Sequence, residues 1–230
     1  MAETLQTLQE KIASLVDQSV TPPTAGGSEW NVRKTFINRA IQEWGDAYDW
    51  EALRAVWWFS ASGISGASVA LPTTFRKMAA KPLVYQFAGE TATSEDGEEW
   101  DEIMPGEVGE YTNSHKHYYI LGDSGNGFNM IWNPGTLSSG ASIMFQYYKK
   151  PTELSAAVDV SECLNPEFLI DRAIALIFEA RSDARFQEME TKAREKLLQM
   201  VDDENTKSRA YDNRVKTPEE RIYHFRVGRD

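Results

Sequence analysis

The chain is poor in cysteine, in long apolar runs and in basic charge. Cys163 is its one cysteine, which excludes a disulfide framework within the chain and a cysteine-rich zinc site. No apolar run approaches the ~18 residues that a membrane helix needs. The N-terminal stretch is acidic and lacks the layout of a signal peptide. We therefore expect the chain to act in the cytoplasm where it is made, or to leave by another route such as lysis.

Basic residues are scarce overall, and many of them stand at the C-terminal end. The formal net charge of the chain is -11, which argues against a general nucleic-acid binder because phosphate contacts need Lys and Arg. Between Lys207 and Asp230, however, seven basic residues stand against four acidic ones. This stretch is predicted to be an extended arm that orders on another surface. The residues expected to make that contact are Arg209, Tyr211, Arg214, Arg221, Ile222, Tyr223, Phe225 and Arg226.

Apolar periodicity predicts helices at both ends of the chain and short strands between them. Apolar residues recur at spacings of three and four over residues 4–20, 29–44, 166–181 and 183–205. Turn signals and short apolar runs over residues 55–150 predict a small antiparallel β region. The predicted fold is α+β, a helical bundle of about four helices with this β region inserted and an extended C-terminal arm. Residues 1–206 would form one domain and residues 207–230 the arm.

Two local enrichments supply further candidate residues. Residues 89–110 hold nine acidic side chains and no Lys or Arg, which indicates a solvated loop. Its central members are Glu95, Asp96, Glu98, Glu99 and Asp101. Tryptophan gathers in fewer than thirty residues, either to fill a core or to anchor a subunit interface. These residues are Trp30, Trp44, Trp50, Trp57 and Trp58.

Patterns that could indicate catalysis have simpler interpretations. His115 and His117 would share one face of a strand, but a metal site needs further ligands. Gly122-Asp123-Ser124-Gly125 occurs around the nucleophile of trypsin-like proteases, and a hairpin loop explains its glycines fully. No P-loop, dinucleotide fingerprint or nucleophile elbow is present. We expect no catalytic residue, metal or cofactor, and a metal-dependent hydrolase is the least favoured alternative.

Several motifs in a fixed order go beyond composition. An Ile-Asn-Arg-Ala helix is followed by Asp-Trp and Leu, then by a strand and a Leu-Pro step, then by Ile-Trp-Asn-Pro and a proline-led helix. This order resembles the head-to-tail adaptor, or connector, proteins of tailed bacteriophages. The motifs lie at 36–41, 48–53, 68–78, 131–134, 145–151 and 166–168. Thr74 stands where that family often has Asp, and the helix before Ser28 has no counterpart in the resemblance.

The resemblance implies a structural virion protein rather than an enzyme. Such adaptors form a ring, typically of twelve subunits, beneath the portal protein. They continue the DNA channel and present a platform to the next neck or tail protein. On this basis the arm is expected to dock on the portal and the acidic stretch to line the lumen or rim. DNA would then pass through without specific binding. The virion neck, assembled in the host cytoplasm, would be the location.

The basic end keeps a second interpretation open. A DNA-binding or packaging accessory protein could use residues 207–230 on phosphates. Salt separates the two, because phosphate binding weakens steeply with salt whereas an aromatic-anchored protein contact persists.

Overall fold

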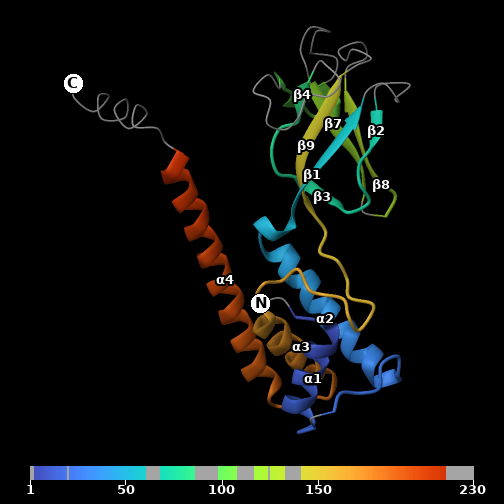
Figure 1. Cartoon of the computed structure of the whole chain (residues 1–230), viewed down its shortest axis with the longest axis vertical. Helices are drawn as coiled ribbons and strands as arrows, with labels where there is room; N and C mark the ends of the chain where they lie inside the picture. Colours follow the sequence, from blue (N-terminus) through green and yellow to red (C-terminus); the bar gives the residue numbers. More distant parts are fainter. Residues whose placement is uncertain are drawn as a thin grey trace, which may run out of the picture. The chain divides into compact units, whose positions relative to one another are not determined.

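The computed structural model describes residues 3–19, 21–60, 68–85, 98–107, 117–123, 125–132 and 141–215 (Figure 1). The chain divides into two compact units. The helical unit combines Met1–Glu51 with Thr152–Asp230, and the β unit is the intervening Ala52–Pro151. The β unit is thus an insertion within the sequence of the helical one.

The helical unit consists of α1 (Leu5–Val16), α2 (Ser28–Ala47), α3 (Pro166–Ala180) and α4 (Phe186–Val215). The side chain of Thr4 caps α1 by accepting a hydrogen bond from the backbone N–H of Thr7. Pro166 opens α3, where its fixed φ suits the first turn. Ten of the fifteen residues of α3 are buried, and α3 packs against each of the other three helices. It is therefore the centre of the unit.

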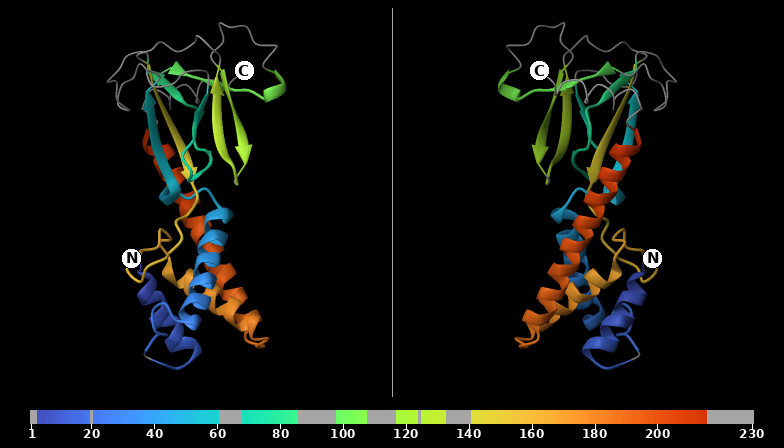
Figure 2. Two further views of the ribbon diagram at one scale, coloured as in Figure 1. Left: turned by 90° about the vertical axis from the view of Figure 1, so that its right-hand side faces the viewer. Right: turned by 90° about the vertical axis from the view of Figure 1, so that its left-hand side faces the viewer.

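The β unit contains two sheets in its described part, preceded by a 3-10 turn at Glu51–Leu53. In the first sheet, β9 pairs along its length with β1 on one side and with β3 and then β4 on the other, and β5 follows β4. The second sheet has the order β2-β8-β7-β6 (Figure 2). The strands are β1 (Arg54–Ser60), β2 (Ser68–Ala70), β3 (Phe75–Met78), β4 (Leu83–Tyr85), β5 (Glu98–Glu99), β6 (Asp101–Glu102), β7 (His117–Asp123), β8 (Gly127–Trp132) and β9 (Ser142–Lys149).

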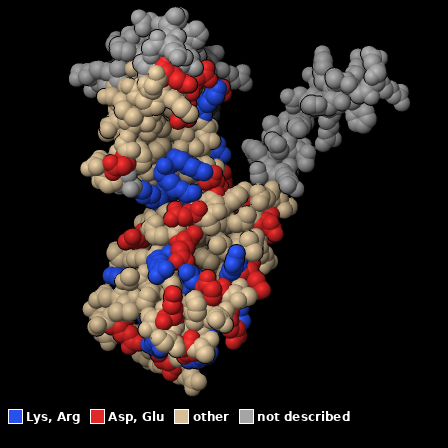
Figure 3. All heavy atoms as spheres, turned by 180° about the vertical axis from the view of Figure 1, so that it is seen from behind, with Lys and Arg blue, Asp and Glu red and all other residues tan. Residues whose placement is uncertain are grey.

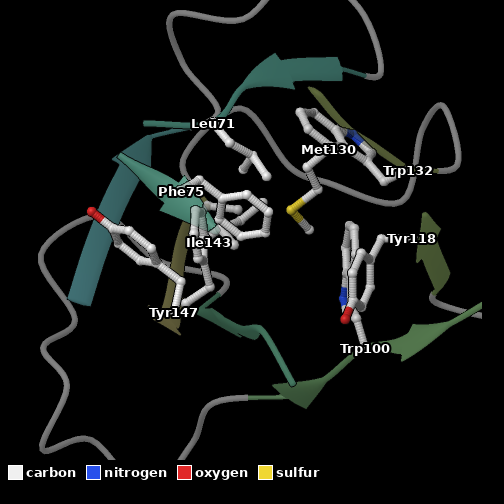
Figure 4. Close-up of a cluster of buried hydrophobic side chains, with 10 residues drawn as sticks. Leu71, Phe75, Trp100, Tyr118, Met130, Trp132, Ile143 and Tyr147 are labelled. Carbon is white, nitrogen blue, oxygen red and sulfur yellow. The ribbon is translucent and has the colours of Figure 1, made fainter. Parts of the chain in front are cut away.

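Side chains from both sheets meet in one aromatic core (Figure 4). The rings of Trp57 and Phe145 stand edge to face, with centroids 4.9 Å apart. Trp100 has no exposed surface, and its ring lies 6.5 Å from that of Trp132. Such pairs add to the stabilisation that burial of the rings already gives.

The hairpin between β7 and β8 explains the glycine-rich string. Gly122 has φ +131°, and a Cβ there would stand 2.1 Å from the carbonyl oxygen of Gly127, so only glycine fits. The carboxylate of Asp123 accepts hydrogen bonds from the backbone N–H groups of Gly125 and Asn126 and from the side chain of Asn126. These bonds, led by the one from the Asn126 side chain, hold the pKa of Asp123 below its ordinary value. The string forms a turn; Ser124 lies outside the described residues.

Parts of the predicted fold class are wrong, although α+β holds. The helices do not form a regular bundle: α3 is apolar nearly all round, so it occupies the centre instead of presenting one stripe to a shared core. The β region is two packed sheets, and β6 pairs with β7 in parallel. Residues 207–215, predicted as extended, continue α4. No Gly or Pro interrupts that helix, and its basic residues suit a helix C-terminus.

The acidic stretch is also more structured than the predicted loop. Residues 98–102 form β5 and β6, and a 3-10 turn follows at Pro105–Glu107. Trp100 points into the core while Glu99 and Asp101 are exposed, which is the alternation of an extended chain.

Among the helices that the structure describes, none combines the length and the apolar character of a membrane span.

Candidate assembly surfaces

The end of α2 is tied to the second half of α4 by an aromatic corner. The rings of Trp44 and Trp50 stack at 5.4 Å, and Nε1 of Trp50 donates to the carbonyl of Trp44. Tyr48 meets the Trp50 ring edge-on and donates its hydroxyl to Oδ1 of Asn205 at 2.7 Å. This contact fixes α4 near residue 205, ten residues before its end at Val215.

Arg172 joins three helices from the middle of α3. Its guanidinium binds Glu43 of α2 through Nε and Nη2 and Glu190 of α4 through Nη1. Arg39 adds a bond to Glu43 at 3.1 Å. Burial of Glu43 opposes its ionisation, but the hydrogen bonds and charges of Arg172 and Arg39 outweigh it, so the pKa of Glu43 lies below its ordinary value. Ion pairs thus set the mutual positions of α2, α3 and α4.

A second charged cluster closes the opposite end of the unit. The buried Arg33 of α2 binds Asp17 at the end of α1 and Glu29 one turn earlier in α2. Arg181, at the end of α3, lies 3.9 Å from Asp17 and 3.8 Å from Glu29. This cluster joins the ends of three helices.

The residues of the Ile-Asn-Arg-Ala motif have structural roles. Ile37 and Ala40 are buried. Asn38 uses both ends of its amide, donating to the carbonyl of Leu154 at 3.0 Å and accepting from the N–H of Leu154 at 2.9 Å. The motif therefore anchors the chain where it returns from the β unit.

The returning chain forms a pinned loop, Thr152–Leu164, which we call the knob loop. The N–H of Thr152 donates to Glu162, and Asp159 accepts from the N–H groups of Ser155 and Ala156. Thr4 and Val160 form an antiparallel bridge beside α1. Leu154, Ser161 and Cys163 are buried, whereas three apolar side chains of the loop are exposed: Val158, Val160 and Leu164.

A groove lies between α2, α3 and α4, beside the Arg172 network. Its volume is about 230 Å³, and it combines apolar side chains with both signs of charge. Leu198, the residue after Leu197 in α4, is 59% exposed. The lining residues are Glu43, Phe168, Arg172, Glu190, Ala193, Arg194 and Leu197.

The structure describes only some of the predicted site residues. Arg209, Tyr211 and Arg214 lie on the last turns of α4, while Arg221, Ile222, Tyr223, Phe225 and Arg226 lie outside the described residues. Glu95 and Asp96 also lie outside them; Glu98 and Glu99 belong to β5, and Asp101 in β6 pairs with Lys81 at 2.6 Å.

The predicted tryptophans divide between the two units, and Trp57 packs against the aromatic core of the β unit. Trp30, Trp44 and Trp50 are buried in the helical unit, whereas Trp57 and Trp58 on β1 are half-buried. His117 is buried, and His115 lies outside the described residues. In the parts that the structure describes, no three His, Cys, Asp or Glu side chains are placed to hold a metal ion.

The sequence interpretation missed a basic cluster in the β unit. Register places the start of β1 opposite the end of β9, with β3 on the other side of β9. This gathers Arg54, Arg76, Lys77, Lys149 and Lys150 at one end of the first sheet. Figure 3 shows Lys and Arg gathered on that unit, while charges of both signs intermix over the helical unit. Local sequence pattern does not indicate this cluster, because the residues are up to 96 positions apart (150 − 54) and only strand pairing brings them together.

Comparison with known families decides the identity. A family model described as SU10 adaptor protein matches residues 3–218. The chain belongs to the SU10 adaptor protein family. The SU10 adaptor match confirms the coarser part of the predicted resemblance, a phage adaptor, and it includes the helix before Ser28, which the motifs had not covered. No curated protein matches the chain.

Membership in the SU10 adaptor family has direct consequences. The chain is a phage adaptor protein, and the family implies a virion component with a structural role. It interacts with other phage head or tail proteins. The motif residues described above fit this role, since Asn38, Ile37 and Ala40 hold the fold together.

Proposed function

We propose that the chain forms a ring beneath the portal, joins the phage head to the tail and continues the DNA channel. The observation that carries this proposal is the SU10 adaptor match, which spans both units and reaches past the end of α4. The ring is expected to have twelve subunits and to lie in the neck of the virion. It would assemble in the host cytoplasm.

The architecture of the helical unit supports this role. A connector must transmit force between head and tail without deforming. Here Arg172, Arg33 and the Asn38 amide each tie together segments far apart in sequence. Charge-assisted bonds with partly buried partners hold helices at fixed positions more strongly than exposed pairs do.

The segment from Lys207 onward docks on the portal in this proposal. Its first nine residues extend α4, so the basic and aromatic side chains start from a helix that the aromatic corner holds at Asn205. Arg209, Tyr211 and Arg214 belong to the helical part, and Arg221, Ile222, Tyr223, Phe225 and Arg226 follow. Aromatic and Arg side chains are the commonest anchors of protein interfaces.

The acidic residues around β5 and β6 face the lumen or rim in this proposal. Glu99 and Asp101 are exposed, and Glu95, Asp96 and Glu98 belong to the same stretch. Negative walls repel phosphate and keep DNA from sticking as it slides. Replacing these five residues by Gln and Asn should slow DNA ejection; unchanged packaging and ejection would contradict the assignment.

Electron microscopy of the chain mixed with purified portal tests the central proposal. An added ring beneath each portal is the expected result, and portals that stay bare would overturn it. A chain truncated after Thr206 should lose portal binding by at least tenfold. As a control, the same truncated chain should lose only the helical circular dichroism of residues 207–215 and should unfold at a similar denaturant concentration.

Salt distinguishes portal docking from binding to DNA. The portal contact should persist at high salt because apolar anchors carry much of it. If residues 207–230 instead bound phosphates, affinity for duplex DNA would fall log-linearly with salt. Steep salt-dependent DNA binding, with no ring on the portal, would favour the accessory-protein alternative.

A further inference from the structure

We propose that neighbouring copies of this chain contact each other head to tail, with the knob loop of one copy seated in the groove between α2, α3 and α4 of the next. The proposal rests on the proposed ring, and it names the two surfaces that would close it. Both surfaces belong to the helical unit.

The knob loop has the properties of a preformed contact surface. Val158, Val160 and Leu164 are 77%, 53% and 62% exposed, although the loop that carries them is pinned from within. An apolar side chain held rigidly outward loses little entropy on binding, so its burial translates more fully into affinity. Exposed apolar clusters on an ordered segment are typical of protein contact sites.

The groove offers a matching floor. Phe168 and Ala193 close its bottom with 2% and 1% of their surface exposed, the half-buried Leu197 lines its side, and the neighbouring Leu198 is exposed. A volume of about 230 Å³ accommodates a few aliphatic side chains such as those of the knob loop.

Charge at the rims is complementary. Glu153 is exposed on the knob loop, and Arg194 is exposed at the groove. Neither makes an ion pair within the described residues. An acidic loop with outward apolar side chains and a groove that carries the exposed Arg194 occur on the same chain, which favours another copy as the occupant.

The two surfaces are formed by different segments of the helical unit, as a ring requires. The bridge from Thr4 to Val160 places the knob loop beside α1. The groove is lined by residues of α2, α3 and α4, where Glu43 and Glu190 meet Arg172. Contacts between two different surfaces are heterologous, and they generate closed rings or open filaments rather than symmetric dimers.

Two variants that each damage one surface provide the test. The knob variant carries Val158→Asp and Val160→Asp, and the groove variant carries Arg194→Glu and Leu198→Glu. Each variant alone should form no ring with or without portal, with self-association weakened by at least about tenfold. The equimolar mixture should form a one-to-one heterodimer and nothing larger, because one intact knob and one intact groove remain. Mass photometry and sedimentation velocity measure both results.

Controls separate this contact from folding and from the ring itself. The changed side chains are exposed, so the variants should keep the circular dichroism and melting temperature of the unchanged chain. Met104→Asp, at a 71% exposed residue of the β unit, should assemble normally. Combining Glu153→Arg with Arg194→Glu should restore part of the association that Arg194→Glu alone removes.

The possible failures are distinguishable. Rings from either variant alone, or a mixture that yields no heterodimer, would overturn the knob-and-groove contact while leaving the ring proposal intact. If the unchanged chain forms no ring on the portal, the proposed function itself fails. A second readout is a Val160→Cys, Leu198→Cys chain, which should give a ladder of disulfide-linked multimers when oxidised on the portal.

Discussion

Different interactions stabilise the interior of each of the two units. The helical unit relies on polar ties between distant segments, such as Arg172 between Glu43 and Glu190. The β unit relies on aromatic rings packed between two sheets. Among the described residues, six of the nine exposed large apolar side chains belong to the helical unit and three to the β unit. Of the six in the helical unit, three lie together on the knob loop: Val158, Val160 and Leu164.

The largest expected effect comes from the aromatic core. Phe145→Ala should lower the free energy of unfolding by about 3–5 kcal/mol, because the ring is fully buried and its removal leaves a cavity. Urea unfolding followed by tryptophan fluorescence measures the change. The control Val56→Ala, at a side chain 52% exposed on the same sheet, should cost less than about 0.5 kcal/mol. A similar loss in both variants would mean that the core does not dominate the β unit.

Breaking the three-helix ion network should have the next largest effect. Arg172→Met should cost about 2–3 kcal/mol, less than for a fully buried pair, because Glu43 and Glu190 are 34% and 41% exposed and partly screened. Unfolding monitored by helical circular dichroism measures it. Arg39→Met, at the more exposed arginine that also binds Glu43, is the matched control and should cost under about 1 kcal/mol. Equal costs would show that Arg172 has no special role.

Loss of the Asn38 amide should have a somewhat smaller effect. Asn38→Ala removes two hydrogen bonds and leaves the N–H and carbonyl of Leu154 without them, at an expected cost of about 1–2 kcal/mol. The control is Asn31→Ala, which removes one exposed bond to the carbonyl of Gly26. Hydrogen exchange at Leu154 should accelerate in the first variant alone. Unchanged exchange there would contradict the anchoring role of Asn38.

The smallest expected effect is a pH dependence of the stability of the helical unit. The folded pKa of Glu43 is depressed below 4.5, so its contribution is complete above about that pH and is lost as pH falls through the folded value. We expect a decrease of less than about 1 kcal/mol, because the side chain is a third exposed. Denaturant unfolding across a pH series should show a weaker acid dependence for Glu43→Gln than for the unchanged chain. If Glu43→Gln and the unchanged chain showed the same pH dependence, Glu43 would not contribute to the acid sensitivity of folding.

The sequence predicts local structure in this protein better than it predicts pairing. The stripe of Leu5, Leu8 and Ile12 and the opening Pro166 identify their helices because helix formation depends on residues three and four apart. The short strand β3 and the burial of Trp100 depend instead on partners far along the chain, so local pattern did not reveal them. The central place of α3 was likewise hidden, since periodicity shows which side chains are apolar but not what covers them.

The candidate surfaces likewise divide into those that local sequence indicates and those that depend on tertiary structure. The basic C-terminal segment and the motif containing Asn38 were visible in the sequence, the motif through its resemblance to phage adaptors. The knob loop and the groove were not, because they depend on how Thr152–Leu164 folds back on itself and on which face of α4 meets α3.

The pairing of β1 with β9 also has a consequence for the order of folding. α2 and α3 must meet although the whole of Ala52–Pro151 separates them, and closing so long a loop is entropically costly and slow. Register sets Arg54 opposite Tyr148, so a folded insertion brings its own two ends together. If the insertion folds first, it acts on the helices as a short turn. Helix docking would then be fast once the sheet has closed and slow whenever the sheet is damaged.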